Sequence, residues 1–174
     1  EIVMRLFGSK ALFIIITITI TMLFLAACSA PFEEVIGETN EAVEQEFNQE
    51  PDKVNNDNED IEYRLPFGVE IEEETPNNIL LKNGSKTYIL FYNQHENSGS
   101  KVVYESTLKQ QTEWDANETF EKDGEFGYLL VNTLEDGVYQ IVTGVGGVKL
   151  TTESKNLKSD AVTMMSIANS VKIK

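Results

Sequence analysis

Residues 126–153, "FGYLLVNTLEDGVYQIVTGVGGVKLTTE", contain three apolar, β-branched runs separated by turn signals, which indicates consecutive strands. The first two runs meet at Asp136-Gly137, and a second such pair, Asp123-Gly124, precedes the stretch. Asp-Gly pairs favour type I′ hairpins because both central residues of the turn take positive φ. The stretch and the residues just before it therefore predict an antiparallel meander.

Further strands are predicted upstream of the meander. "GVEIEEE" alternates Val69 and Ile71 with glutamates, which is the period-two pattern of a strand with one side in water. "NILLK" then leads into Asn83-Gly84, a strong hairpin signal. Residues 86–92, "KTYILFY", include an apolar run that suits a central strand buried on both faces.

Residues 100–111, "SKVVYESTLKQQ", fit two kinds of element. Ser100 is a suitable N-cap for a short helix, whereas Val102, Tyr104 and Leu108 would also suit a strand. We predict a helix over this range.

The chain also has the pattern of a C-terminal helix. Ser159 is the predicted N-cap, and Asp160 lies in the first turn, where a negative charge is favourable near the positive end of the helix dipole. Apolar residues then recur at the three-and-four spacing of a buried face: Ala161, Met164, Met165, Ala168 and Val171.

These elements predict an α+β fold for residues 63–174. A segment of this length forms one core, so we expect a single globular domain with an antiparallel sheet of five to seven strands. One or two helices are expected to cover one face of the sheet. A signal peptide and a disordered acidic linker are expected to precede the domain.

Residues 1–27 have the layout of a secretory signal peptide. Arg5 and Lys10 precede a run of 17 uncharged residues, Ala11 to Ala27. A bilayer span needs about 20 apolar residues, so this run is short for an anchor. Positive residues before the run and an acidic remainder after it predict export of the remainder.

The run ends at Cys28, the single cysteine of the chain. Leu25-Ala26-Ala27-Cys28 resembles the lipobox of bacterial lipoproteins in all four positions. The resemblance implies that a signal peptidase recognises Leu25, Ala26 and Ala27, cuts before Cys28, and leaves a diacylglyceryl group on the cysteine sulfur. Two acyl chains give stable attachment, so the membrane itself is the expected first partner, on its extracytoplasmic face.

An incidental cysteine in an uncleaved signal anchor is the alternative reading of this segment. In either case Cys28 has no second cysteine to form a disulfide within the chain.

Residues 28–62 are expected to form a disordered linker. Between Ser29 and Glu62 there are 12 acidic residues and one basic residue, Lys53, so the segment has little apolar surface to offset its conformational entropy. Its charge predicts an extended tether that holds the domain away from the lipid. The spacing of Val35, Thr39, Val43 and Phe47 allows a weak helical face, which we expect to have no fixed tertiary position.

Few residues in residues 63–174 suggest catalysis. His95 lies in a polar loop sequence and is expected at the surface. Gly144, Gly146 and Gly147 lie between strands and lack the Lys-Ser/Thr ending of a phosphate loop, so a tight connection or close packing is the better explanation. We identify no catalytic, cofactor-binding or metal-ligating residue.

Composition argues against nucleic acid as a partner. The chain has 29 acidic and 14 basic residues, whereas phosphate binding needs clustered Lys and Arg. Residues 144–172, "GVGGVKLTTESKNLKSDAVTMMSIANSVK", resemble the C-terminal part of uncharacterised lipoproteins of low-GC Gram-positive bacteria. This resemblance implies a location and a fold, with no catalytic residue to carry over.

We therefore expect a lipid-anchored, non-enzymatic binding or adaptor domain with a protein partner at the cell surface. The first alternative is a carrier or sensor that holds an apolar ligand between sheet and helix, and the second is a small hydrolase. An apolar cavity beneath the helix would favour the carrier, and an exposed apolar or aromatic patch would favour the adaptor.

Overall fold

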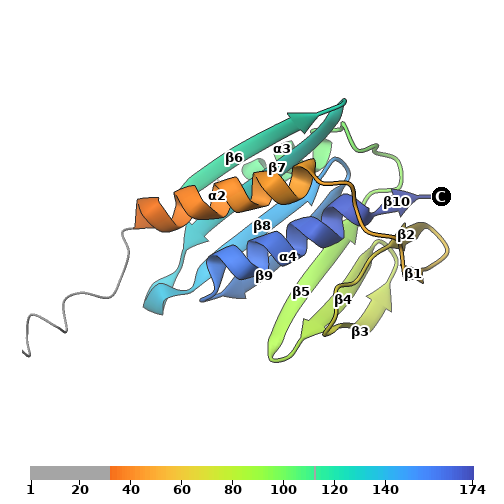
Figure 1. Ribbon diagram of the computed structural model, residues 1–174, viewed down its shortest axis with the longest axis horizontal. Helices are drawn as coiled ribbons and strands as arrows, with labels where there is room; N and C mark the ends of the chain where they lie inside the picture. The colour runs from red at the N-terminus through yellow and green to blue at the C-terminus, as the bar shows by residue number, and fades with distance from the viewer. Residues whose placement is uncertain (1–31, 112) are drawn as a thin grey trace, which may run out of the picture. The chain divides into compact units, whose positions relative to one another are not determined.

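The structure, a computed structural model, describes residues 32–111 and 113–174 and shows an α+β fold (Figure 1). A seven-stranded sheet has the order β3-β4-β5-β9-β8-β7-β6, and a three-stranded sheet has the order β1-β2-β10. All strand pairs in both sheets are antiparallel, so the predicted fold class is confirmed. Residues 1–27, with Leu25, Ala26 and Ala27, lie outside the described residues, and so does Cys28.

The large sheet consists of β3 (Val69–Thr75), β4 (Asn78–Asn83), β5 (Lys86–Tyr92), β6 (Ala116–Lys122), β7 (Glu125–Thr133), β8 (Tyr139–Val145) and β9 (Val148–Ser154). The small sheet consists of β1 (Asn56–Asp57), β2 (Ile61–Tyr63) and β10 (Lys172–Ile173). The helices of the described residues are α2 (Phe32–Asn48), α3 (Val102–Gln110) and α4 (Leu157–Ser170).

The predicted meander is confirmed as β6 to β9, although its turns differ from one another. Asp123 and Gly124 both have positive φ, 53° and 89°, as a type I′ hairpin requires. The turn at Gly137 is wider, with a short 3₁₀ segment at Glu135–Gly137 and positive φ at the glycine alone of the pair. A two-residue hairpin at that position is therefore wrong.

Residues 32–62 are folded, so the prediction of a disordered linker is wrong for this range. The face of α2 that the spacing suggested is buried: Thr39 and Val43 are 0% exposed and Phe47 is 1% exposed. A Cβ on Gly127 would lie 2.8 Å from the Phe47 ring, so the glycine leaves the space in which that ring lies. Composition predicted disorder, but the buried face of α2, with the Phe47 ring in the space that Gly127 leaves, packs the helix against the sheet.

The domain therefore begins about thirty residues before the predicted boundary at residue 63. Residues Glu33–Lys174 form one compact unit. Ile61 and Tyr63 are 0% exposed, and Ile61 pairs with Ile173 near the other end of the chain. The predicted boundary between residues 62 and 63 lies within β2.

The helix α4 lies beside α2, and the two helices run in the same direction (Figure 1). Near their first turns, Lys158 Nζ lies 3.1 Å from Glu38 Oε2. Near their last turns, Asn169 Nδ2 donates to the carbonyl oxygens of Glu46 and Gln49. Contacts at both ends therefore align the two helices.

The predicted C-terminal helix is confirmed, with different ends. It starts at Leu157, so Ser159 lies inside the first turn and is not the N-cap. Val171 follows the last helical residue. The buried residues are Leu157, Asp160, Ala161, Met164, Met165, Ile167, Ala168 and Ser170.

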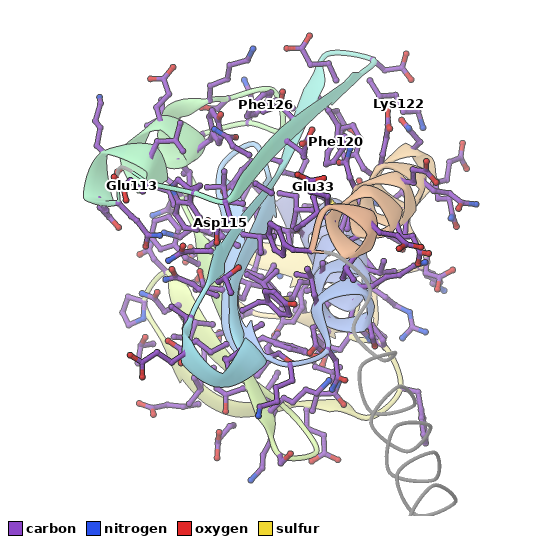
Figure 2. All side chains as sticks on the ribbon, turned by 90° about the vertical axis from the view of Figure 1, so that its left-hand side faces the viewer. Glu33, Glu113, Asp115, Phe120, Lys122 and Phe126 are labelled. Atoms are coloured by element: carbon purple, nitrogen blue, oxygen red, sulfur yellow. The ribbon has the colours of Figure 1, made fainter. Side chains whose placement is uncertain are left out.

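Helices lie on both faces of the large sheet (Figure 2). On β7, Gly127 contacts α2, whereas the alternate residues Phe126 and Tyr128 face the other way and pack with Tyr104 of α3. The predicted helix at residues 100–111 is thus confirmed as α3, although its N-cap is Lys101 and not Ser100. It covers part of the face that we expected to be free of helices.

The second face of β5 remains partly open. Tyr88, Leu90 and Tyr92 are buried in the core, but Ile89 is 47% exposed and Phe91 is half-buried. The strand is central in the sheet, as predicted, but burial on both faces is wrong.

We predict that Phe47→Ala destabilises the domain by about 3 to 5 kcal/mol, because it removes a fully buried ring and leaves the Gly127 notch empty. Urea unfolding of the full chain, followed by circular dichroism, measures the change. Val35→Ala is the matched control on the same helix, since Val35 is half-buried and one turn before the buried segment. Equal stability of the Phe47→Ala variant and the wild type would show that α2 is not docked.

Candidate functional site

Phe67 is the most exposed large apolar side chain of the described residues, with a relative exposure of 105%. The residues two positions before and after it, Leu65 and Val69, are 5% and 7% exposed. The backbone N–H of Val69 donates to the Pro66 carbonyl oxygen at 3.1 Å, and Gly68 between them has φ +86°. Positive φ at the third residue of such a turn, but not at the second, is the type II geometry, and it places Phe67 at an exposed corner.

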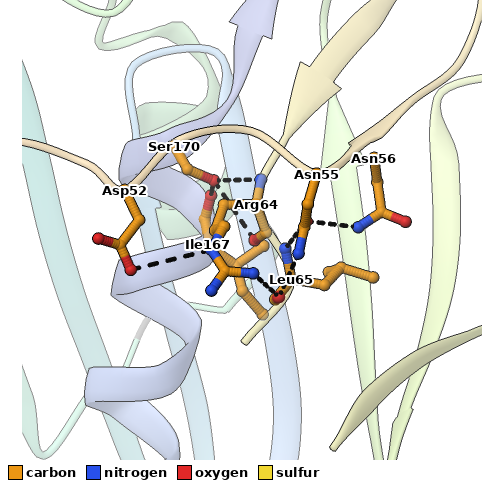
Figure 3. A network of polar contacts seen from close by, with 7 residues as sticks. All are labelled: Asp52, Asn55, Asn56, Arg64, Leu65, Ile167 and Ser170. Carbon is orange, nitrogen blue, oxygen red and sulfur yellow. Dashed lines mark hydrogen bonds and ion pairs between the residues drawn. The ribbon is translucent and has the colours of Figure 1, made fainter. Parts of the chain in front are cut away.

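A network of hydrogen bonds fixes the strand end that leads into this turn (Figure 3). Asn55 holds the Leu65 backbone twice: its Nδ2 donates to the Leu65 carbonyl oxygen at 3.0 Å, and its Oδ1 accepts from the Leu65 N–H at 2.9 Å. The Arg64 N–H donates to Ser170 Oγ at 2.8 Å, which ties the segment to the end of α4. Phe67 is therefore presented by a rigid backbone.

Arg64 contributes to the same network through its side chain. Its Nη1 donates to the Leu65 carbonyl oxygen at 2.7 Å, and its Nε lies 3.8 Å from Asp52 Oδ2 (Figure 3). The guanidinium thus supports the backbone of the turn from the side of residues 52–56.

A groove of about 560 Å³ lies beside Phe67, and we call it the Phe67 groove. Its volume is within the range of binding sites, and Ile71, 42% exposed, adds a second apolar side chain. The lining residues are Asn55, Asn56, Arg64, Leu65, Pro66, Phe67, Gly68, Val69, Glu70 and Ile71. These residues come from β1 and the residue before it, from the segment after β2 and from β3, and the network in Figure 3 connects Asn55 and Asn56 to Arg64 and Leu65.

The groove continues along β3, which is an outer strand of the large sheet. Among the described residues, β4 pairs with one side of β3 and no strand pairs with the other. A register shift between Ile71 and Glu73 interrupts the strand. Four exposed glutamates follow the groove along this edge: Glu70, Glu72, Glu73 and Glu74.

The sequence contained a signal for this site that we did not use. "LPFGV", residues 65–69, places an aromatic residue between proline and glycine. Such a sequence favours a type II turn, whose corner residue is exposed. The motif does not indicate that Asn55, ten residues before Leu65, forms hydrogen bonds with the Leu65 backbone.

The residues that the sequence brought up as catalytic or phosphate-binding candidates lie elsewhere. His95 is exposed in the loop after β5. Gly146 and Gly147 form the tight turn between β8 and β9, where their N–H groups donate to the carbonyl oxygens of Phe126 and Asn97. These amides are used within the fold, so the explanation by a tight connection is confirmed.

Asp160 is a buried carboxylate with a complete set of partners. Its oxygens accept from Lys86 Nζ at 2.6 and 2.9 Å, and Oδ1 accepts from Tyr88 Oη at 2.8 Å. Burial, and next the hydrogen bond to Asp160, raise the pKa of Tyr88 above its ordinary value. The cluster therefore connects α4 to the β4–β5 hairpin, and we assign it a structural role.

No group of three or more His, Cys, Asp or Glu in the described part of the chain is arranged to hold a metal ion. No family model matches the chain, and no curated protein matches it. Among solved structures, the chain is similar to a protein from Bacteroides thetaiotaomicron VPI-5482, with 11% identity, a TM-score of 0.36 and coverage of 66% of this chain. The match spans 45% of that protein's length, and at this TM-score it carries no argument about function.

We predict that Asn55→Ala destabilises the protein by about 1 to 3 kcal/mol, because the buried Leu65 backbone loses both hydrogen bonds to this side chain. Asn56→Ala is the matched control, since its Nδ2 donates to the Asn55 side chain at the surface. Urea unfolding gives the stability, and hydrogen exchange at the Leu65 amide reports the loosened turn. Identical exchange in both variants would contradict the role of Asn55.

Proposed function

We propose that this protein is a lipid-anchored extracytoplasmic lipoprotein whose folded domain is a non-enzymatic binding or adaptor module. The observation that carries the proposal is the preorganised exposure of Phe67 beside a groove. An aromatic ring held by a rigid turn loses little conformational entropy when it enters a partner. Such side chains are the usual anchors of protein interfaces.

The partner that suits the Phe67 groove is a protein segment in extended conformation with Lys or Arg side chains. An outer strand with free backbone groups accepts a further strand from a partner. The exposed glutamates of β3 favour a positively charged segment and disfavour an acidic one. Phe67 and Ile71 then supply the apolar contact at one end of that segment.

The anchor in this proposal is Cys28, modified with a diacylglyceryl group after recognition of Leu25, Ala26 and Ala27. Among the described helices, none is both long and apolar enough to cross a bilayer. Ser29, Ala30 and Pro31 separate Cys28 from the start of α2. The acidic segment is therefore not a flexible spacer in the proposal, because its residues from 32 onward are folded.

We retain the carrier or sensor as the second candidate, with a different location for the ligand. The face of α4 that meets the sheet is closely packed, with Met164 and Met165 both 0% exposed. A pocket at the margin of α3, on the opposite face of the sheet, is the observation that favours this candidate.

For the anchor, we predict that Cys28→Ala abolishes incorporation of labelled fatty acid and leaves the full-length precursor. The sulfur is the attachment atom, and alanine has none. Metabolic labelling of intact cells and the mass of the purified protein measure both effects. Labelling that persists in the Cys28→Ala variant would refute this anchor.

For the binding site, we predict that a photo-crosslinking amino acid at position 67 captures a discrete partner in intact cells. The same amino acid at Gln94, an exposed loop position, is the control for random contact. Glu73→Lys should reduce capture from position 67, because it reverses a charge on the binding edge. Equal adducts from positions 67 and 94, or capture that is insensitive to Glu73→Lys, would contradict the proposed surface.

A further inference from the structure

A second pocket lies at the margin of α3 and shares no lining residue with the Phe67 groove. Its volume is about 330 Å³, at the lower end of the range for small-molecule sites. It is lined by Phe91, Asn93, Val102, Val103, Ser106, Gln110 and Lys149. Lys149 is the single charged side chain among these residues.

The register of the sheet builds the floor of this pocket. Phe91 of β5 pairs with Lys149 of β9, so their side chains project from the same face of the sheet. The Lys149 ammonium lies 5.7 Å from the centre of the Phe91 ring. Val103 of α3 is buried beside them, whereas Val102 is 51% exposed at the surface.

The ammonium of Lys149 is partly buried and has weak polar support. Its Nζ lies 3.4 Å from Thr107 Oγ1, a long hydrogen bond, and that hydroxyl itself donates to the Val103 carbonyl oxygen at 2.8 Å. Burial lowers the pKa of Lys149 below its ordinary value. Removing a cation from water is costly unless an opposite charge compensates it.

Other lysines of the described chain show the contrast. Of the eleven lysines in the described residues, six, including Lys149, have no carboxylate within ion-pair distance, and five do: Lys82, Lys86, Lys101, Lys158 and Lys174. In a chain of net charge −15, a half-buried lysine that faces a pocket free of carboxylates is the exception. The missing counter-charge is best explained by an anion that enters the pocket.

We propose that this pocket binds a small monocarboxylate with an apolar body. In this arrangement, Lys149 pairs with the ligand carboxylate, and Asn93, Ser106 and Gln110 offer hydrogen bonds around it. Phe91, Val102 and Val103 contact the apolar part. One lysine neutralises one negative charge, and a dianion would keep an excess charge within a strongly acidic protein, so a monoanion fits best.

The test compares benzoate with benzamide, its neutral analogue of nearly the same shape. Saturation-transfer NMR on the full chain in nonionic detergent measures both dissociation constants, and we expect a Kd of about 1 mM for benzoate. Benzamide should bind about 10- to 100-fold more weakly, because it lacks the charge that Lys149 recognises. Equal binding of the two probes, or binding of neither, would overturn the proposal.

Two sets of variants locate the binding. Lys149→Met should abolish the preference for benzoate over benzamide. Ser106→Asp places a carboxylate on the exposed side of the pocket and should weaken benzoate binding, whereas Ser106→Asn is the neutral control and should not. Because Ser106 is exposed, these two variants test the site even if Lys149→Met fails to fold. Unchanged benzoate binding in Ser106→Asp would contradict the assigned pocket.

Discussion

The contact between the Phe47 ring and Gly127 is the constraint that places α2 on the sheet and so extends the domain to the acidic segment. The ring occupies the space that a side chain on β7 would take, and it lies 5.9 Å from the Phe120 ring of β6. This contact holds α2 against the sheet and leaves α4 to pack beside it. Two helices thus lie on one face of the sheet, and α3 covers part of the other face.

Both candidate sites arise where this coverage ends. The Phe67 groove lies at the outer strand β3, next to the small sheet that closes the end of the core. The Lys149 pocket lies on the second face, where α3 stops short of β5. Ile89, 47% exposed on the same strand, shows how far that face remains open. The core is thus closed on one side of the sheet, and the two candidate sites lie on its edge and on its other side.

The strands of the large sheet followed from the sequence because their signals are local, whereas the small sheet and the wider turn at Gly137 did not. A type I′ turn needs positive φ at two adjacent residues, and an Asp-Gly pair such as Asp123-Gly124 tolerates this conformation better than most residue pairs. The docking of α2 did not follow, because Phe47 and Gly127 are eighty residues apart and neither is unusual alone. An acidic composition indicates that a segment can bury little apolar surface. It does not indicate whether a distant glycine leaves space for one of the segment's aromatic rings.

The same argument explains what was missed at the sites. The turn signal around Phe67 is local, but the hydrogen bonds from Asn55 and Ser170 to the backbone just before it come from distant parts of the chain. Lys149 alternates with Val148 and Leu150 in the sequence, and that spacing alone does not show how far its side chain is buried. Its partial burial comes from Thr107 and Phe91, two partners that the pattern does not reveal.

The length of α2 fixes the distance between its first turn and its last turn. The helix has 17 residues, which is about 25 Å along its axis. Its first turn follows Cys28 closely in the chain, while the Phe67 groove is tied to Ser170, where the parallel helix α4 ends. Within the folded part of the chain, the two parallel helices therefore act as a fixed spacer between the first turn of α2 and the segment that carries Phe67.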